Sequence, residues 1–139
     1  MDEKALKYLY RLISQRDYTE KTLRDKLRKK GFSSNVINNS LNRLKELGYL
    51  DQENFIRNYI NSSIKKLYGP ARIKSKLYEK GIDYSETEAV LEEIYDYETI
   101  KRNLEILRLK NKKDKEKFIA FCIRRGFSLR DILDSLKDD

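Results

Sequence analysis

Apolar residues recur every three or four positions along most of the chain, with charged and polar residues between them. This spacing gathers the apolar side chains on one face of an α-helix. One proline and five glycines in 139 residues leave few points at which helices can break. We therefore expect an all-α protein in which each glycine ends a helix: Gly31, Gly48, Gly69, Gly81 and Gly126.

One pattern of ten residues occurs three times. Its copies are LRDKLRKKGF at 23–32, IKSKLYEKGI at 73–82 and FIAFCIRRGF at 118–127. Their glycines are 50 and then 45 residues apart, a period typical of helical repeats rather than of one centred core. The apolar fraction of 39% also favours an elongated body with thin local cores. The pattern predicts an elongated array of three tandem three-helix repeats, at 1–50, 51–97 and 98–139.

Polar residues stand where the predicted helices should begin, since a Ser, Thr or Asp side chain can accept hydrogen bonds from the first free backbone amides. The expected N-caps are Thr19, Ser33 or Ser34, Asp51 and Ser128. The string SETE at 85–88 has the form of a capping box, which places the start of the sixth helix at Ser85. The fourth helix is expected to run through Leu67 and to end near Gly69.

The middle helix of the third copy is more apolar than its counterparts. Ile119 and Ile123 stand where the first copy has Arg24 and Arg28. A helix that is apolar nearly all round is buried on more than one side, so we expect these isoleucines to pack under neighbouring helices. An exposed apolar strip for a partner is the alternative.

Residues that could carry catalysis are few. Cys122 is the only cysteine, so no internal disulfide can form; it takes the apolar position of Leu27 and Leu77 and has no histidine to activate it. We read it as a core residue. The carboxylates Glu92, Glu93 and Asp96 lie in a span, 81–100, with seven acidic and no basic residues, which is typical of a solvated or partner-facing helix. We therefore expect that the protein is not an enzyme and that it binds neither a cofactor nor a metal.

The net charge of +8 favours polyanions or acidic partners. Residues 57–80 hold seven basic residues against one acidic, and residues 101–117 hold eight against three, on either side of the acidic span. Alternating blocks suit a partner that itself alternates, such as a protein filament on nucleic acid; blocks that serve only solubility are the alternative. No apolar run is long enough to cross a membrane, and the first residues have no signal-peptide pattern, so we expect a cytoplasmic protein.

A basic residue precedes the glycine of every copy, at Lys30, Lys80 and Arg125. Recurrence could indicate a series of binding residues. A cation in the last turn of a helix also interacts favourably with the negative end of the helix dipole. We favour this structural interpretation over ligand binding.

Three strings resemble the RecX family, bacterial regulators of the RecA recombinase. They are YTEKTLRDKLRKKGF at 18–32, LKELGYLDQENFIRNYI at 44–60 and GPARIKSKLYEKGI at 69–82. The residues that match the family's Gly-x-Leu-Asp-x-x-x-Phe segment are Gly48, Leu50, Asp51 and Phe55. Those that match its second-repeat signature are Gly69, Arg72, Ile73, Leu77 and Gly81. The resemblance covers residues 5–95, and the third copy keeps only the spacing.

The resemblance implies a curved array of three-helix repeats that binds in the groove of the RecA–DNA filament. It implies repression of ATP hydrolysis, strand exchange and coprotease activity without catalysis by the protein itself, which we expect to be a monomer. We hypothesise that a basic surface faces the filament or its DNA: Lys65, Lys66, Arg72, Lys74 and Lys76. The alternative function is sequence-independent binding of single-stranded nucleic acid, and a helical scaffold for another protein is a third.

Overall fold

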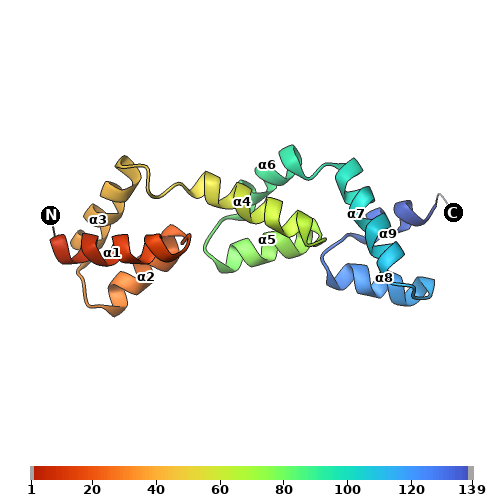
Figure 1. The fold of residues 1–139 in the computed structure, drawn as a ribbon, viewed down its shortest axis with the longest axis horizontal. Helices are drawn as coiled ribbons and strands as arrows, with labels where there is room; N and C mark the ends of the chain where they lie inside the picture. Colours follow the sequence, from red (N-terminus) through yellow and green to blue (C-terminus); the bar gives the residue numbers. More distant parts are fainter. Residues whose placement is uncertain (1, 138–139) are drawn as a thin grey trace. The chain divides into compact units, whose positions relative to one another are not determined.

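The computed structural model describes residues 2–137, and within that range the chain forms nine helices and no strand (Figure 1). The helices are α1 (Glu3–Gln15), α2 (Glu20–Lys29), α3 (Ser34–Glu46), α4 (Gln52–Lys65), α5 (Pro70–Glu79), α6 (Tyr84–Ile94), α7 (Tyr97–Lys110), α8 (Lys115–Arg124) and α9 (Leu129–Leu136). The all-α prediction is confirmed. We refer to α1–α3, α4–α6 and α7–α9 as repeats 1, 2 and 3. None of these helices is both long and apolar enough to cross a membrane.

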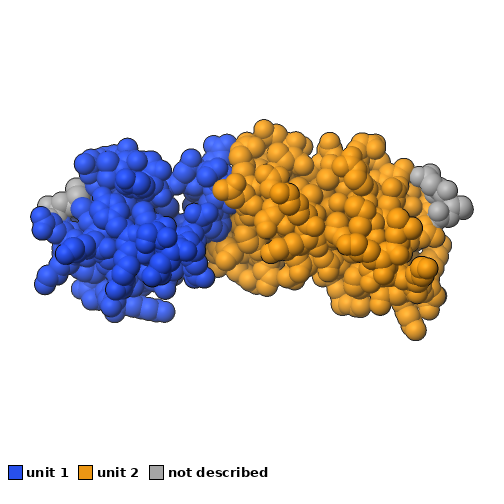
Figure 2. All heavy atoms as spheres, viewed as in Figure 1, with its two compact units in different colours: residues 1–55 blue, residues 56–139 orange. Residues whose placement is uncertain are grey.

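The chain divides into two compact units, Met1–Phe55 and Ile56–Asp139 (Figure 2). Unit 1 holds repeat 1 and the first turn of α4. Unit 2 holds the rest of α4 and continues through repeat 3. The repeat limits expected from the sequence, at residues 50 and 97, stay predictions.

Unit 1 is built on one apolar cluster, to which all three helices of repeat 1 contribute. Its buried members are Ala5, Leu9, Leu12, Leu23, Leu27, Ile37, Leu41 and Leu44. Burying an aliphatic side chain of this size contributes roughly 1.5–3 kcal/mol, so the cluster is the main source of stability in the unit. Leu23 and Leu27, the apolar pair of the repeated pattern, are completely buried.

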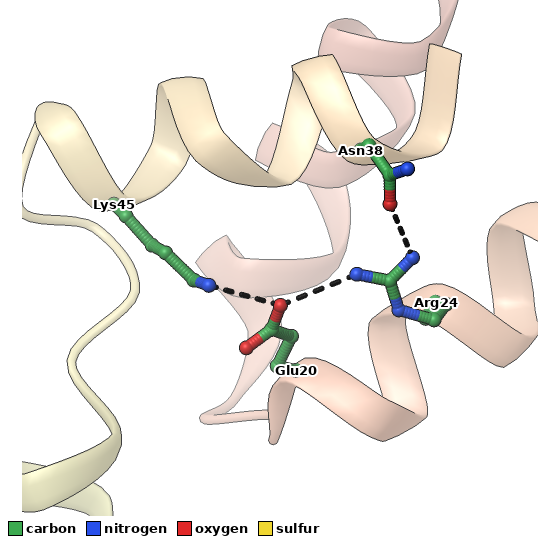
Figure 3. A network of polar contacts seen from close by, with 4 residues as sticks. All are labelled: Glu20, Arg24, Asn38 and Lys45. Carbon is green, nitrogen blue, oxygen red and sulfur yellow. Dashed lines mark hydrogen bonds and ion pairs between the residues drawn. The ribbon is translucent and has the colours of Figure 1, made fainter. Parts of the chain in front are cut away.

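A polar network joins α2 to α3 at the edge of this core (Figure 3). The carboxylate of Glu20 lies 3.0 Å from Lys45 Nζ and 3.3 Å from Arg24 Nη2. Arg24 also donates a hydrogen bond of 2.7 Å to the Asn38 side chain. The partly exposed ion pairs add little stability, and the shared Glu20 contacts both helices at the edge of the core.

In unit 2 the backbone of repeat 3 contacts the backbone of repeat 2. The amide of Gly69 donates to the Arg125 carbonyl at 2.8 Å, and the amide of Ala71 donates to the Gly126 carbonyl at 3.0 Å. A β-carbon on Gly69 would overlap the backbone of Gly126 and Phe127. Glycine is therefore required here for close approach.

This contact corrects the role predicted for Gly69. The helix α4 ends at Lys65, and Leu67, not Gly69, takes the left-handed backbone conformation after it, with φ of 64°. Gly69 has φ of −90° and is the N-cap of α5. The other four glycines follow the ends of helices, as predicted, and have positive φ: Gly31, Gly48, Gly81 and Gly126.

Most of the predicted N-caps are confirmed. The side chains of Thr19, Ser33 and Ser128 cap α2, α3 and α9, and Asp51 accepts from the Asn54 amide at the start of α4. The prediction that a capping box at 85–88 begins the sixth helix is wrong. Helix α6 begins earlier, at Tyr84, with Asp83 as N-cap and no side-chain hydrogen bond at that position.

The burial predicted for the third middle helix is wrong at one of its two isoleucines. Ile123 on α8 is 48% exposed and Ile119 is half-buried. Phe118 and Cys122 are the buried residues of α8. Because α8 packs on α9 through this one face, the face that carries Ile123 lies in solvent.

Candidate functional site

Three cationic side chains surround a small pocket between α4 and α5, which we name the α4–α5 basic pocket. Lys66 follows the end of α4, and Arg72 and Lys76 lie one turn apart on α5. The pocket has a volume of about 190 Å³. Its other lining residues are Tyr59, Ser62, Ser63, Tyr68 and Ile73. Positive charge beside hydroxyl groups suits an anionic group such as a phosphate or a carboxylate.

An aromatic ring orients Arg72 in this pocket. The Arg72 guanidinium lies 4.2 Å from the centre of the Tyr68 ring, a cation–π contact. Burial raises the pKa of the Tyr59 hydroxyl, and the charge of Arg72 opposes the shift. The hydroxyl is therefore neutral at physiological pH.

The structure brings together three of the five residues predicted for the basic surface. Lys66, Arg72 and Lys76 line the α4–α5 basic pocket, and Lys76 also lies 3.7 Å from Glu79 in an exposed ion pair. Lys65 is exposed, but it does not line the pocket.

Lys74, the fifth residue, links two helices of repeat 2. Its ammonium lies 3.2 Å from the Glu88 carboxylate on α6. Arg24 and Asn38, the equivalent positions of repeat 1, form the corresponding contact between α2 and α3. Lys74 therefore links α5 to α6 through a partly exposed ion pair.

Sequence reasoning missed the uncharged residues of the pocket. Ser62 and Ser63 are three and four positions after Tyr59, a spacing that places the three residues on one face of α4, and this spacing could have identified them. Tyr68 comes from the turn between α4 and α5, where no periodic signal exists.

The basic residues before the glycines contact aromatic rings of their own unit. Lys30 lies over the Tyr8 ring at 5.2 Å, and Lys80 over the Tyr59 ring at 5.8 Å. Arg125 lies over the Tyr68 ring at 4.4 Å and donates to the carbonyls of Lys66 and Leu67. These contacts favour the structural interpretation of the series.

Two acidic residues of α6 and the following turn have structural partners. Glu93 pairs with Arg57, and Asp96 is the N-cap of α7. Hydrogen bonds from the Thr99 side chain and amide lower the pKa of the Asp96 carboxyl. Within residues 2–137 no three His, Cys, Asp or Glu side chains lie close enough together to hold a metal ion.

Cys122 is completely buried on α8, and burial raises the pKa of its thiol to about 11. At pH 8 the reactive thiolate is therefore rare and inaccessible. We expect Ellman's reagent to label the native protein at least ~100-fold more slowly than the protein in denaturing urea. Since the chain has one cysteine, the signal has one source. Labelling of the native protein at the unfolded rate would contradict the buried position.

Comparison with known proteins gives the same family throughout. A family model described as the first three-helix domain of RecX matches residues 3–44. The regulatory protein RecX of Caldanaerobacter subterraneus subsp. tengcongensis is 31% identical over 136 residues, which cover 94% of this chain and 68% of the relative. The protein of the same name from Chlorobium phaeobacteroides is 31% identical over 147 residues, which cover 97% of this chain and 95% of the relative.

Solved structures share the fold. The crystal structure of RecX from Lactobacillus salivarius matches with a TM-score of 0.87 and 23% identity, over 97% of this chain and 94% of that one. A second crystal structure of a regulatory protein RecX matches with a TM-score of 0.85 and 22% identity, over 98% of this chain and 72% of that one. At this identity the likeness shows the fold alone.

Proposed function

Because this chain belongs to the RecX family, we propose that it regulates the RecA recombinase by binding in the groove of the RecA–DNA filament. In this proposal the protein is a non-enzymatic inhibitor that represses ATP hydrolysis, strand exchange and coprotease activity. The observation that carries the proposal beyond the family is the α4–α5 basic pocket. It binds an anionic group of the filament, either a DNA phosphate or a RecA carboxylate.

The charges of the pocket support binding of an anionic partner. Lys66, Arg72 and Lys76 supply positive charge beside the hydroxyl groups of the pocket. A cationic surface of this kind steers an anionic partner and sets the register of the complex. Arg72 is held by Tyr68, so it meets an anion with little loss of side-chain entropy.

The test is the single-stranded-DNA-dependent ATPase of the cognate RecA, titrated with the protein at near-physiological salt. We expect inhibition below one molecule per RecA protomer. The double variant Lys66→Glu, Lys76→Glu should raise the inhibitory midpoint about 10-fold or more, because both reversals lie in the pocket. Lys65→Glu is the matched control and should shift the midpoint less than about 2-fold.

The test distinguishes a failure of the RecA proposal from a failure of the proposed contact surface. If the unchanged protein has no effect at equimolar RecA, the RecA proposal is wrong. If the double variant inhibits as well as the unchanged protein while its helical content is preserved, the contact surface lies outside the pocket.

One observation favours direct binding of single-stranded nucleic acid as the second candidate. Tyr78 and Tyr84 are stacked with ring centres 4.7 Å apart and planes 7° from parallel, and they are 56% and 49% exposed. Exposed aromatic faces can stack on bases of any sequence. Binding of this kind should weaken steeply with salt, and Tyr78→Ala should reduce it more than Tyr97→Ala, a matched exposed tyrosine on α7.

A further inference from the structure

In unit 2, carbonyl groups at and just after the C-terminal end of α4 accept hydrogen bonds from side chains further along the chain. These side chains come from repeat 3 and from the turn that leads to it. The Tyr95 hydroxyl donates to the Tyr68 carbonyl at 2.7 Å, and the Asn103 amide donates to the Ile64 carbonyl at 3.0 Å. The Arg125 guanidinium donates to the Leu67 carbonyl at 2.9 Å and lies over the Tyr68 ring. The Arg125 side chain of repeat 3 therefore lies against the C-terminal end of α4 in repeat 2.

The internal repeats identify the equivalent place in unit 1. Alignment of the repeated pattern pairs Tyr18 with Tyr68 and Asp17 with Leu67. Both repeats therefore have a tyrosine at the first of these positions. At the second position, repeat 1 has the carboxylate of Asp17 where repeat 2 has the apolar side chain of Leu67. The position equivalent to Arg125 in repeat 2 is Lys80, whose ammonium lies over the Tyr59 ring of its own repeat.

In unit 1 the C-terminal end of α1 lines a pocket of about 410 Å³, which we name the α1 pocket. One side comes from α1 and the turn after it, and the other from the α3–α4 connection and the first turn of α4. The residues on the two sides are Tyr10, Ile13, Ser14, Asp17 and Tyr18, and Gly48, Tyr49, Leu50, Asp51, Asn54 and Phe55. Two of these side chains are carboxylates and none is basic, in a chain whose net charge is +8.

We propose that the α1 pocket binds the guanidinium group of an arginine side chain of a partner protein. The carboxylates of Asp17 and Asp51 pair with the guanidinium. Tyr10 and Tyr49, with ring centres 5.9 Å apart in an edge-to-face arrangement, provide aromatic surface beside it.

Two physical features select this occupant, the shape of the guanidinium and the negative charge of the pocket. A planar guanidinium can pair with a carboxylate and stack on an aromatic ring at once, which an ammonium cannot do. Arg16 and Lys26 already lie over the Tyr18 ring at 4.7 and 5.6 Å, so the incoming group meets Tyr10 and Tyr49 instead. The two aspartates repel phosphate, so this pocket and the α4–α5 basic pocket take partner groups of opposite charge.

The inference goes beyond the proposed function, because its ligand chemistry does not depend on RecA. The probe is N-acetyl-arginine methylamide, added to the full chain and followed by amide NMR shifts. We expect shifts at residues 13–18 and 48–54. The citrulline analogue has the same shape without the charge, and it should bind at least 5-fold more weakly.

Variants assign the effect to the carboxylates. Asp17→Asn should weaken arginine binding at least 3-fold, and so should Asp51→Asn, which keeps a residue that can cap α4. Asp83→Asn, an exposed aspartate of unit 2, is the matched control and should have no effect. Equal binding of the arginine and citrulline probes, or shifts confined to other residues, would overturn the inference. Arginine binding without any effect on RecA would contradict only the proposed function.

Discussion

Gly69→Ala is expected to lower the free energy of unfolding of unit 2 by about 3 kcal/mol or more. The backbone of Gly69 has φ of −90°, which alanine adopts freely, so the loss does not come from backbone strain. It comes from overlap of the new methyl group with the backbone of Gly126 and Phe127, which cannot rotate away. Relief of the overlap would break the hydrogen bonds from Gly69 and Ala71 to repeat 3.

The thiol of Cys122 reports on unit 2 specifically, so its protection across a urea titration is the measurement. Gly31→Ala is the matched control. Gly31 has φ of +90°, but no atom lies within 4 Å of the place that an alanine methyl group would take. Its substitution should therefore cost about 1–2 kcal/mol of backbone strain in unit 1 and leave Cys122 protected. Unchanged protection of Cys122 in Gly69→Ala would show that repeats 2 and 3 do not need the close approach.

Local rules predicted the helix ends that depend on local contacts. Thr19 and Ser33 cap the helices that follow them by bonding amides three residues away, and this geometry is visible in the sequence. The end of α4 is different. Arg125, 58 residues further along the chain, donates to the carbonyl of Leu67, and no local pattern contains that contact.

The predicted basic surface stays a prediction, and spacing along the chain shows only in part which of its residues lie together. Charge counting identified the segment 57–80, and helical spacing places Arg72 and Lys76 on one face of α5. Lys74 is two positions from each of them, so it points to another side of the helix, where it meets Glu88. Spacing could therefore have separated Lys74 from the pocket. The α1 pocket could not be found in this way, because its two sides come from segments about 30 residues apart.

Arg125→Ala is expected to lower the free energy of unfolding of unit 2 by about 2–3 kcal/mol. The guanidinium donates to the carbonyls of Lys66 and Leu67, at the end of α4, where carbonyls have no partner within the helix. It also lies over the Tyr68 ring, which Arg72 contacts as well. Truncation removes both contacts and frees Leu67 from its left-handed conformation.

Two variants separate the geometry of Arg125 from its charge, again with Cys122 protection in urea as the measurement. Arg125→Lys keeps the charge but cannot reach two carbonyls in one plane, so it should recover less than half of the loss. Lys80→Ala removes the equivalent cation of repeat 2, which lies over the Tyr59 ring, and should cost less than about 1 kcal/mol. Equal losses in Arg125→Ala and Lys80→Ala would contradict the role of Arg125 as the link between repeats 2 and 3. A larger loss in Arg125→Ala than in Lys80→Ala would mean that Arg125 joins repeat 3 to repeat 2. The equivalent residue of repeat 2, Lys80, would then contribute only within its own repeat.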